Sequence, residues 1–459
     1  MSKIFLIGIG GAGMNKLALL LKDFGNKVFG SDIKSNRKTE KLQNKGINIY
    51  IGHNKNNINK SIDLVIYSSA IPSSNEELIQ AKKLGITIKK RGEALAEITK
   101  KFKTIVVSGT HGKTTTTALI GHILKENGKK TNVYIGGGEE KFDSFDKTAK
   151  LFVIESDESD RSFLFFKPKI LVITNIDKDH LGAYQNSFKN LKQAFKTLQD
   201  KSEKKVICRD DKNVFSIANL SDTNTFFYSI KNKKANIFAT NIKYSASETE
   251  FDLFYLRKFI GKGFLPSYGD KNVLNVLAAI SVAHLSGIKI KDALTSLKSF
   301  SMPNRRMKIR GEIGGITVID DHADHPTEIE STLNAIKKHF PSKRIIAVFQ
   351  PHRYSRVNEL KQNIAKPFHY ADIIISTDIY PAFEAPIKGI NGSVINKWIK
   401  EKNEKKEVYY GKQLEDVTQI LRKILKRNDL IVLLGPGDIE NFSPFLIRFL
   451  KGVTCEKKH

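Results

Sequence analysis

The chain has 459 residues but only two cysteines, Cys208 and Cys455, which stand far apart and in no spacing typical of metal ligands. This scarcity excludes a disulfide-stapled scaffold and a zinc finger, and it suits a reducing cytoplasm. A chain of this length can bury about three quarters of the surface that it exposes when unfolded, so it needs no disulfide for stability. At roughly 150 residues per domain, the length predicts about three domains.

Long apolar runs are also missing. The longest, such as residues 430–434, have the length of a strand and are too short to cross a bilayer. The apolar stretch at residues 4–9 is interrupted by glycine, and no small-residue cleavage site of a signal peptide follows it. We therefore expect a soluble cytoplasmic protein without membrane insertion.

Arginine is scarce beside lysine, with 14 Arg against 62 Lys, although the net charge is +28. Such a charge can indicate a polyanionic partner, including nucleic acid. Dedicated nucleic-acid surfaces favour Arg and clustered patches, whereas the lysines here are scattered along the whole chain. We interpret the charge as compositional drift and expect no nucleic-acid partner.

Short apolar runs alternate with helix-length amphipathic stretches through most of the chain. Most of these runs are continuously apolar, which is typical of strands covered by helices on both faces. The repeated order of strand and helix predicts an α/β fold with doubly wound sheets. The expected strands are residues 3–9, 27–29, 64–67, 104–107, 151–155, 170–174, 205–208, 316–319, 344–349, 372–376 and 430–434.

Two segments indicate domain junctions. The basic stretch 100–103 and the stretch 301–306 each precede a fresh series of strands, so we expect domains at residues 1–101, 102–301 and 302–459. Residues 221–268 are expected to be rich in short strands, as an elaboration of the middle domain.

A glycine-rich turn follows the first expected strand. Gly8, Gly10 and Gly13 fit the G-x-G-x-x-G pattern, and Asp32 ends the next strand, where nucleotide-binding folds of this kind place a ribose-binding acid. Glycines allow a tight turn and close approach of the backbone, and the following helix offers its N–H groups to a diphosphate. The motif predicts a nucleotide-diphosphate site without identifying the nucleotide.

The second motif, residues 106–117, resembles a phosphate-binding P-loop. Lys113 stands where such loops contact the β- and γ-phosphates, and Thr114 stands where they hold Mg²⁺. The strict pattern requires a glycine at position 107, which is Val107 here, so the match is to a shorter variant that begins at Gly109.

Acidic and polar side chains follow the next two strands of the middle region. Glu155, Asp157, Glu158 and Asp160 stand at the end of one strand, and His180 follows the other. Four carboxylates so close together repel one another unless a cation or basic groups lie there. We expect Glu155 and His180 to join Thr114 around Mg²⁺, while Asp157 and Asp160 are equally well explained as acids at the start of a helix.

Polar clusters also follow two strands in the last third of the chain. One contains Asp321, His322 and Asp324, and the other contains Arg353 and Arg356, which could bind a carboxylate or a phosphate. Clusters after two successive strands favour a site over isolated packed residues.

In order and spacing, these motifs resemble those of the Mur ligases. The resemblance is carried by residues 8–14, 109–115, 155–160, 174–180, 325–329, 350–354 and 384–386, and it spans nearly the whole chain. It implies an α/β protein of three domains: a Rossmann-like N-terminal domain for a UDP-sugar, a central P-loop-type ATPase domain and a Rossmann-like C-terminal domain. It implies a ligase that uses ATP and Mg²⁺ to join L-alanine to the carboxylate of UDP-N-acetylmuramate through an acyl phosphate, in peptidoglycan precursor synthesis. We expect a monomer or a homodimer.

The resemblance assigns the site residues one by one. Catalytic roles fall on Lys113, Glu155, His180, Arg353 and Arg356, and metal ligation falls on Thr114, Glu155 and His180. ATP binding falls on Gly109, Thr110, His111, Gly112, Lys113, Thr114, Thr115, Asn275, Arg306 and Asp321. UDP-sugar binding falls on Gly8, Gly10, Gly11, Gly13 and Asp32.

Some positions depart from the family pattern. His322 and Asp324 stand where the family usually has tyrosine and histidine, Lys271 stands where histidine is frequent, and the small residues expected near Tyr380 are Pro381 and Phe383 here. These changes affect the expected nucleotide and amino-acid pockets, so the choice of amino acid stays open.

A ligase that attaches a preformed peptide to the same UDP-sugar is the nearest alternative. An NAD-dependent oxidoreductase would explain only the first glycine motif, and a nucleic-acid-dependent ATPase only the charge.

Overall fold

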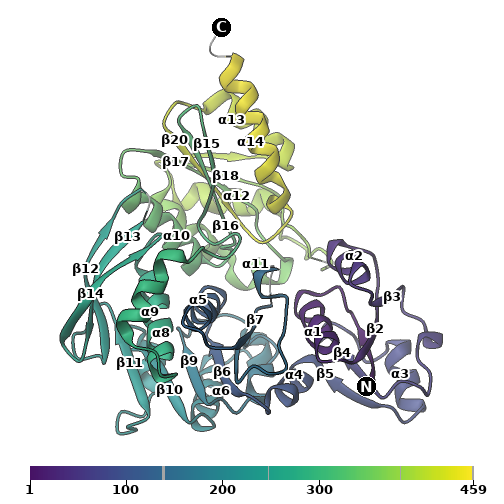
Figure 1. The fold of residues 1–459 in the computed structure, drawn as a ribbon. Coiled ribbons are helices and arrows are strands. Elements are labelled where there is room, and N and C mark those ends of the chain that lie inside the picture. Colours follow the sequence, from purple (N-terminus) through teal and green to yellow (C-terminus); the bar gives the residue numbers. More distant parts are fainter. Residues whose placement is uncertain (137–139, 247, 383, 457–459) are drawn as a thin grey trace. The chain divides into compact units, whose positions relative to one another are not determined.

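Three β-sheets organise the computed structural model, which describes residues 1–136, 140–246, 248–382 and 384–456 (Figure 1). Helices lie between the strands of each sheet along the chain, so the expected α/β class with three domains is confirmed. The chain forms two compact units. The first contains residues 1–241, 251–263 and 273–300, and the second contains residues 242–250, 264–272 and 301–459.

The N-terminal domain has a five-stranded parallel sheet with the order β3-β2-β1-β4-β5. The order reverses between β1 and β4, and ligands of such Rossmann-like sheets bind at the carboxyl ends of the strands beside this point. The strands are β1 Lys3–Ile7, β2 Lys27–Asp32, β3 Asn48–Ile51, β4 Leu64–Tyr67 and β5 Thr87–Lys90, and the helices are α1 Ala12–Asp23, α2 Arg37–Asn44, α3 Glu76–Lys83 and α4 Arg91–Thr99, with a 3-10 turn at Lys55–Asn57.

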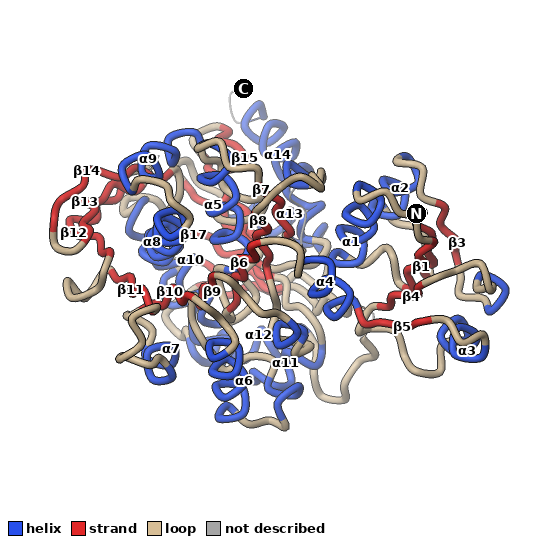
Figure 2. The backbone as a smooth tube through the Cα atoms, turned by 60° about the horizontal axis from the view of Figure 1, so that its bottom comes forward, coloured by secondary structure: helices blue, strands red, loops and turns tan. Residues whose placement is uncertain are grey.

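Side chains of β1 alternate between two hydrophobic clusters. Ile4 and Leu6 belong to the cluster that contains the apolar residues of α1, whereas Phe5 and Ile7 belong to the cluster with Leu78 of α3. Because successive side chains of a strand point to opposite faces of the sheet, α1 and α3 cover opposite faces, as Figure 2 shows. Helices therefore cover both faces of the sheet around β1, and the glycine motif follows directly at the carboxyl end of this strand.

The central sheet has nine strands in the order β14-β13-β12-β11-β10-β9-β6-β8-β7, and the pairs from β7 to β12 are parallel. The strands of the expected β-rich stretch, β11 to β14, extend this sheet at one side. The strands are β6 Lys103–Ser108, β7 Thr131–Tyr134, β8 Leu151–Glu155, β9 Ile170–Ile173, β10 Lys204–Cys208, β11 Thr225–Ser229, β12 Ile237–Tyr244, β13 Thr249–Tyr255 and β14 Lys258–Leu265. The helices are α5 Lys113–Glu126, α6 Phe188–Asp200, α7 Lys212–Ile217, α8 Asp270–Leu285 and α9 Ile290–Thr295, with 3-10 turns at Glu140–Phe142, Ser162–Phe165, Leu181–Tyr184 and Ser296–Ser299.

The C-terminal domain has a six-stranded sheet with the order β15-β16-β20-β17-β18-β19, which is parallel except for the antiparallel pair of β15 and β16. The strands are β15 Lys308–Ile313, β16 Ile316–Asp321, β17 Arg344–Phe349, β18 Ile373–Ser376, β19 Glu407–Tyr410 and β20 Asp429–Leu434. The helices are α10 Pro326–His339, α11 Tyr354–Leu360, α12 Gly392–Lys402, α13 Leu414–Ile424 and α14 Ile439–Glu456, with a 3-10 segment at Lys361–Tyr370.

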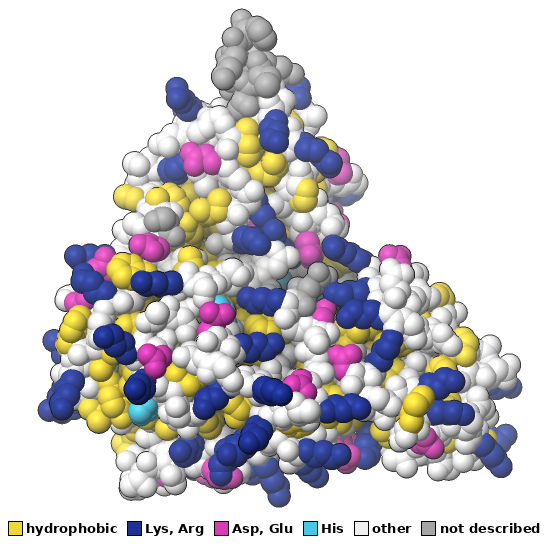
Figure 3. Space-filling model, in the orientation of Figure 1, with side chains coloured by type: hydrophobic (Ala, Val, Ile, Leu, Met, Phe, Trp, Pro, Cys, Tyr) yellow, Lys and Arg dark blue, Asp and Glu magenta, His cyan; other side chains and the backbone are white. Residues whose placement is uncertain are grey.

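Each strand expected from the sequence is present, with ends that differ by a few residues. Within the described residues, no helix has both the length and the hydropathy that a membrane crossing needs. On the face drawn in Figure 3, Lys and Arg side chains are spread over the visible surface, as their scatter along the chain predicts.

Candidate active site

The P-loop motif connects β6 to α5, and two glycines shape it. Gly109 has φ +128° and Gly112, the residue before α5, has φ +79°, both in the region that favours glycine. A Cβ atom at Gly109 would lie 2.3 Å from the Thr174 hydroxyl oxygen, and one at Gly112 would lie 2.7 Å from Oδ1 of Asn275. These close approaches explain why glycine occupies both positions.

The loop after β9 holds the P-loop in place through its backbone and side chains. The backbone N–H of Thr110 donates to the carbonyl of Asn175 (3.0 Å), and that of His111 donates to Oδ1 of Asn175 (2.9 Å). The Thr174 hydroxyl donates to the His111 carbonyl (2.7 Å), and the His111 ring lies 3.2 Å from the Asp177 carboxylate. The carboxyl end of one strand therefore fixes the phosphate-binding loop at the end of its neighbour.

Lys113, the first residue of α5, is buried and points back into this loop. Its ammonium donates to the carbonyls of Gly109 (2.6 Å) and Thr110 (3.0 Å) and to the Glu158 carboxylate (3.0 Å), and it lies 3.5 Å from Asp157. Burial lowers the pKa of Lys113, but the surrounding carboxylates more than offset this effect and raise its pKa above the usual value. The same cation lowers the pKa of Asp157 to well below its ordinary range, against the effect of burial. A fixed positive charge thus stands at the P-loop.

Two of the three expected metal ligands are in direct contact. The Thr114 hydroxyl donates to Oε1 of Glu155 over 2.7 Å, and Oε2 of Glu155 accepts the N–H of Gly136 (3.1 Å). Hydroxyl and carboxylate oxygens are the ligand type that Mg²⁺ prefers. The third residue, His180, has its Nε2 atom 3.6 Å from the Asp179 carboxylate and contributes to lowering the pKa of Asp157.

Asn275 lies on α8 and reaches the P-loop helix from outside the first half of the chain. Its Oδ1 atom accepts the hydroxyl of Thr116 (3.1 Å), one turn beyond Gly112. The structure therefore brings Asn275 beside the loop to which the sequence assigns ATP.

The glycine motif of the N-terminal domain forms a closed turn. Gly8 has φ +79°, and the N–H of Gly11 donates to its carbonyl (3.2 Å). The Asp32 carboxylate accepts the N–H of Gly10 (2.7 Å) and that of Ile33 (2.9 Å). Asp32 thus holds the turn itself, in addition to the ribose contact that the sequence predicts.

In the second unit, Asp321 ties three segments together. Its carboxylate accepts the N–H groups of Met307 (2.7 Å) and Ala323 (3.0 Å) and the hydroxyl of Thr332 (3.1 Å). Burial raises the pKa of Asp321, and the nearby guanidinium of Arg306 acts in the opposite direction. Arg306 and Asp321, which the sequence analysis both assigns to ATP, therefore lie near each other.

The two arginines assigned to the amino-acid site lie at the start of α11. Arg353 precedes the helix with φ +63° and donates its backbone N–H to the Tyr380 carbonyl (2.9 Å). Arg356 donates to the Asp324 carboxylate (2.9 Å), which lies 3.7 Å from the ring of His352. Asp324, which departs from the family pattern, therefore contacts an arginine that is expected to bind the substrate.

Sequence reasoning gave no separate role to several residues that the structure places in the site. Asn175 and Glu158 stand within quoted motifs, but only the fold shows that they hold the P-loop and Lys113. Arg91 and Tyr134 stand in no motif, and Tyr134 donates its hydroxyl to the Gly13 carbonyl (2.5 Å).

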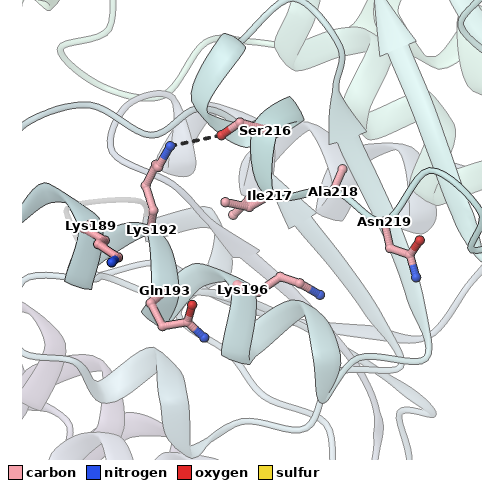
Figure 4. Close-up of a pocket in the computed structure, with 8 residues that line it drawn as sticks. All are labelled: Lys189, Lys192, Gln193, Lys196, Ser216, Ile217, Ala218 and Asn219. Carbon is pink, nitrogen blue, oxygen red and sulfur yellow. Dashed lines mark hydrogen bonds between the residues drawn. The ribbon is translucent and has the colours of Figure 1, made fainter.

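A groove of about 550 Å³ lies between α6 and a segment made of the last two residues of α7 and the two residues that follow (Figure 4). Lys192 donates to the Ser216 hydroxyl there (3.1 Å), and Lys189 and Lys196 line the same side. None of the lining residues belongs to the predicted site.

The three sheets and the P-loop define an α/β protein built to bind a nucleoside triphosphate, and models of the ATP-dependent Mur ligases match all three of its domains. The Mur ligase family catalytic domain matches residues 3–103, the Mur ligase middle domain matches residues 107–283, and the Mur ligase glutamate ligase domain matches residues 305–437. The chain belongs to the Mur ligase family.

Among curated relatives, the chain is similar to the UDP-N-acetylmuramate–L-alanine ligase of Persephonella marina. The two are 38% identical over 467 residues, which cover 98% of this chain and 97% of the relative. The solved UDP-N-acetylmuramate–alanine ligase of Thermotoga maritima has a TM-score of 0.83 at 29% identity, covering 98% of this chain and 100% of that one. A murein peptide ligase of Psychrobacter arcticus has a TM-score of 0.67 at 22% identity, covers 98% and 99%, and shares the fold.

Proposed function

We propose that the chain is an ATP-dependent ligase that joins L-alanine to the carboxylate of UDP-N-acetylmuramate in peptidoglycan precursor synthesis. The observation that carries this proposal is the likeness to the Persephonella marina relative, which extends over 98% of the chain and whose name describes this reaction. The P-loop geometry supports it, because a buried lysine and a Thr–Glu oxygen pair suit a nucleoside triphosphate.

The reaction needs ATP because a free carboxylate is a poor acyl donor. A muramyl carboxylate oxygen attacks the γ-phosphorus of ATP, the bond to the β-phosphate oxygen breaks, and ADP leaves. The alanine amine then attacks the acyl carbon of the acyl phosphate, inorganic phosphate leaves, and the nitrogen loses a proton. The Lys113 ammonium would stabilise charge on the transferring phosphoryl group, and the P-loop N–H groups would orient it.

The residues beside Lys113 fit Mg²⁺. Thr114 and Glu155 would hold the ion with oxygen atoms, and His180 would complete the set from the segment after β9. When bound, Mg²⁺ supplies neutralising charge to the phosphate oxygens.

The remaining assignments form part of the same proposal. Arg353 and Arg356 would face the amino acid, residues 8–13 and Asp32 the UDP-sugar, and Asn275 the adenine. ATP would further contact the loop 109–115, Arg306 and Asp321. The proposed domain ranges are 1–101, 102–301 and 302–459, in a cytoplasmic monomer or homodimer.

Phosphate release from ATP tests the function. We expect release that requires both UDP-N-acetylmuramate and L-alanine, with less or none when glycine, L-serine or a tripeptide replaces alanine. Activity with the tripeptide alone would assign the chain to peptide attachment instead. Release that depends on DNA, or saturable binding of NAD in place of the UDP-sugar, would overturn the proposal.

A further inference from the structure

Arg91 is the first residue of α4 and follows β5 at the carboxyl edge of the N-terminal sheet. The glycine motif follows β1 at the same edge, with β4 between the two strands. The Arg91 side chain spans this distance: a Cβ atom at Gly13 would lie 2.9 Å from its Nη1 atom. The guanidinium therefore covers the first turn of α1, beside the point where ligands of such sheets bind.

The environment of Arg91 keeps it in this place. Gly92 lets α4 approach the central domain so closely that a Cβ atom there would lie 2.4 Å from Cβ of Ser162. The guanidinium contacts the hydroxyl of Tyr134 and donates to the Asp160 carboxylate over a long 3.4 Å. Its side chain is 23% exposed. Within the described residues these partners leave most guanidinium N–H donors available, because the group carries a fork of several donors.

The geometry points to Arg91 as a further substrate-binding residue, which binds the diphosphate of the nucleotide-sugar together with the N–H groups of Ala12 and Gly13 at the start of α1. This inference rests on the proposed function. An arginine fork matches two phosphate oxygens at once, and the N-terminus of α1 attracts the same negative charge. Asp160 holds the guanidinium in position. It belongs to the acidic segment whose Asp157 and Glu158 lie beside Lys113. Arg91 therefore links the glycine motif to the acidic segment at the P-loop.

Calorimetry with the full chain tests this role, using UDP-N-acetylmuramate, UDP, uridine and ATP as probes. We expect Arg91→Ala to raise the Kd of UDP-N-acetylmuramate and of UDP about tenfold or more, since charge-assisted hydrogen bonds are of this strength. The Kd of uridine, which has no phosphate, and that of ATP should stay within about twofold. Arg91→Lys keeps the charge without the fork and should recover part of the loss.

Two matched variants separate binding from a structural role. Lys90→Ala removes one positive charge from the preceding, exposed position and should change the UDP affinity less than about threefold. Asp160→Asn keeps a side-chain oxygen that can accept from Arg91 but removes a negative charge, so UDP binding should stay unchanged or become tighter. If Asp160→Asn weakens UDP as much as Arg91→Ala does, or if Arg91→Ala binds UDP like the wild type, the inference is wrong. Failure of the wild-type protein to bind UDP-N-acetylmuramate would instead overturn the proposed function.

Retained ATP affinity in each variant shows that the unit is folded. If Arg91→Ala loses ATP binding as well, the Arg91→Lys variant decides. A Kd for UDP above the wild-type value, with a wild-type Kd for ATP, supports the role. Wild-type Kd values for both UDP and ATP overturn it.

Discussion

The guanidinium of Arg356 and the carboxylate of Asp324 form a hydrogen-bonded ion pair of 2.9 Å. Burial alone would raise the pKa of Asp324, but Arg356 and His352 lower it, so the carboxylate is ionised at neutral pH. The pair therefore places a fixed negative charge against an arginine that the proposed function assigns to the amino-acid substrate. Under the proposed function, Asp324 would therefore compete with the carboxylate of the amino-acid substrate for Arg356.

Removing the charge of Asp324 should change the use of the amino acid first. In Asp324→Asn, Arg356 is released from its ion pair, so we expect the KM for L-alanine to fall by about fivefold, since one charge-assisted contact is exchanged for another. The KM values for ATP and UDP-N-acetylmuramate should change less than twofold. Steady-state kinetics with each substrate varied in turn measures this, and Asp324→His should act in the same direction.

The control for this variant is Asp372→Asn, which removes a carboxylate that lies 3.7 Å from Lys337 in the same domain. It should leave all three KM values unchanged. An effect of Asp324→Asn on the ATP KM alone would place Asp324 in the nucleotide site and contradict the assignment.

Replacing Lys113 should abolish turnover and leave the N-terminal site intact. Loss of one group that stabilises the transferring charge slows a reaction by roughly a hundred- to a thousandfold, so we expect at least this loss in kcat for Lys113→Met. Binding of UDP-N-acetylmuramate, measured by calorimetry, should persist. Normal ligation by the variant in a coupled phosphate assay would refute the role of Lys113.

The same substitution leaves Glu158 buried without its cation. Glu158 is fully buried, and its carboxylate accepts a hydrogen bond from the Lys113 ammonium. We therefore expect Lys113→Met to lower the free energy of unfolding by about 3 kcal/mol. The double variant K113M/E158Q should recover much of this stability but none of the activity. This outcome would show that Lys113 stabilises the fold by balancing the charge of Glu158 and serves the reaction by a separate role.

The sequence predicted the interior strands and missed the edges of the sheets. The strands that it did not predict include β3 and β5, β7, and β15 and β19, and each lies at the edge of its sheet. Among these edge strands, Asn48–Ile51 is largely exposed and Glu407–Tyr410 is largely half-buried, so they lack the continuous apolar run that marks a strand covered on both faces. Periodicity could not distinguish them from loops.

The local motifs predicted which residues after the strands lie close together, and the roles assigned to these residues stay predictions. Lys113, Thr114 and Glu155 are brought together as expected, because carboxyl ends of adjacent parallel strands meet at one edge. The contacts of Arg91 with Gly13 and Asp160 join segments about 70 residues or more apart, and no local pattern encodes such a contact. Only the fold reveals it.

A buried network around Glu77 should stabilise the N-terminal domain. The Glu77 carboxylate accepts the hydroxyl of Ser31 (2.6 Å) and the amide of Asn57 (2.7 Å), and it lies 2.7 Å from Nδ1 of His53. Glu77→Ala leaves the buried Ser31 hydroxyl and the half-buried His53 and Asn57 without their acceptor, so we expect the opening free energy of this domain to fall by about 2–4 kcal/mol. Hydrogen exchange of peptides that cover residues 27–57 measures the opening locally.

Glu76→Ala provides the comparison for Glu77→Ala, since Glu76 is the exposed neighbour in the same first turn of α3. We expect it to change the opening free energy by less than about 0.5 kcal/mol. Equal exchange in both variants would show that the network adds no stability.

The C-terminal domain should lose stability in mild acid through His322. Burial, with the nearby positive charge of Arg306, lowers the pKa of His322 to about 3 from an ordinary value of 6.5. The folded chain keeps this ring neutral, whereas the unfolded chain binds a proton once the pH falls below 6.5. The stability that His322 contributes is therefore complete above pH 6.5 and is lost as the pH falls toward 3, with a slope of up to about 1.4 kcal/mol per pH unit. The single tryptophan, Trp398, packs against the core of this domain and reports its unfolding by fluorescence.

We expect the free energy of unfolding, measured by urea titration between pH 7 and pH 5, to fall more steeply in the wild type than in His322→Gln, because glutamine takes up no proton. The exposed His369 lies in the same domain, and His369→Gln should follow the wild-type slope. Other titrating groups are common to all three proteins and cancel in the differences. Parallel slopes for the wild type and His322→Gln would mean that the ring is protonated in both states, and the low pKa of His322 would then be wrong.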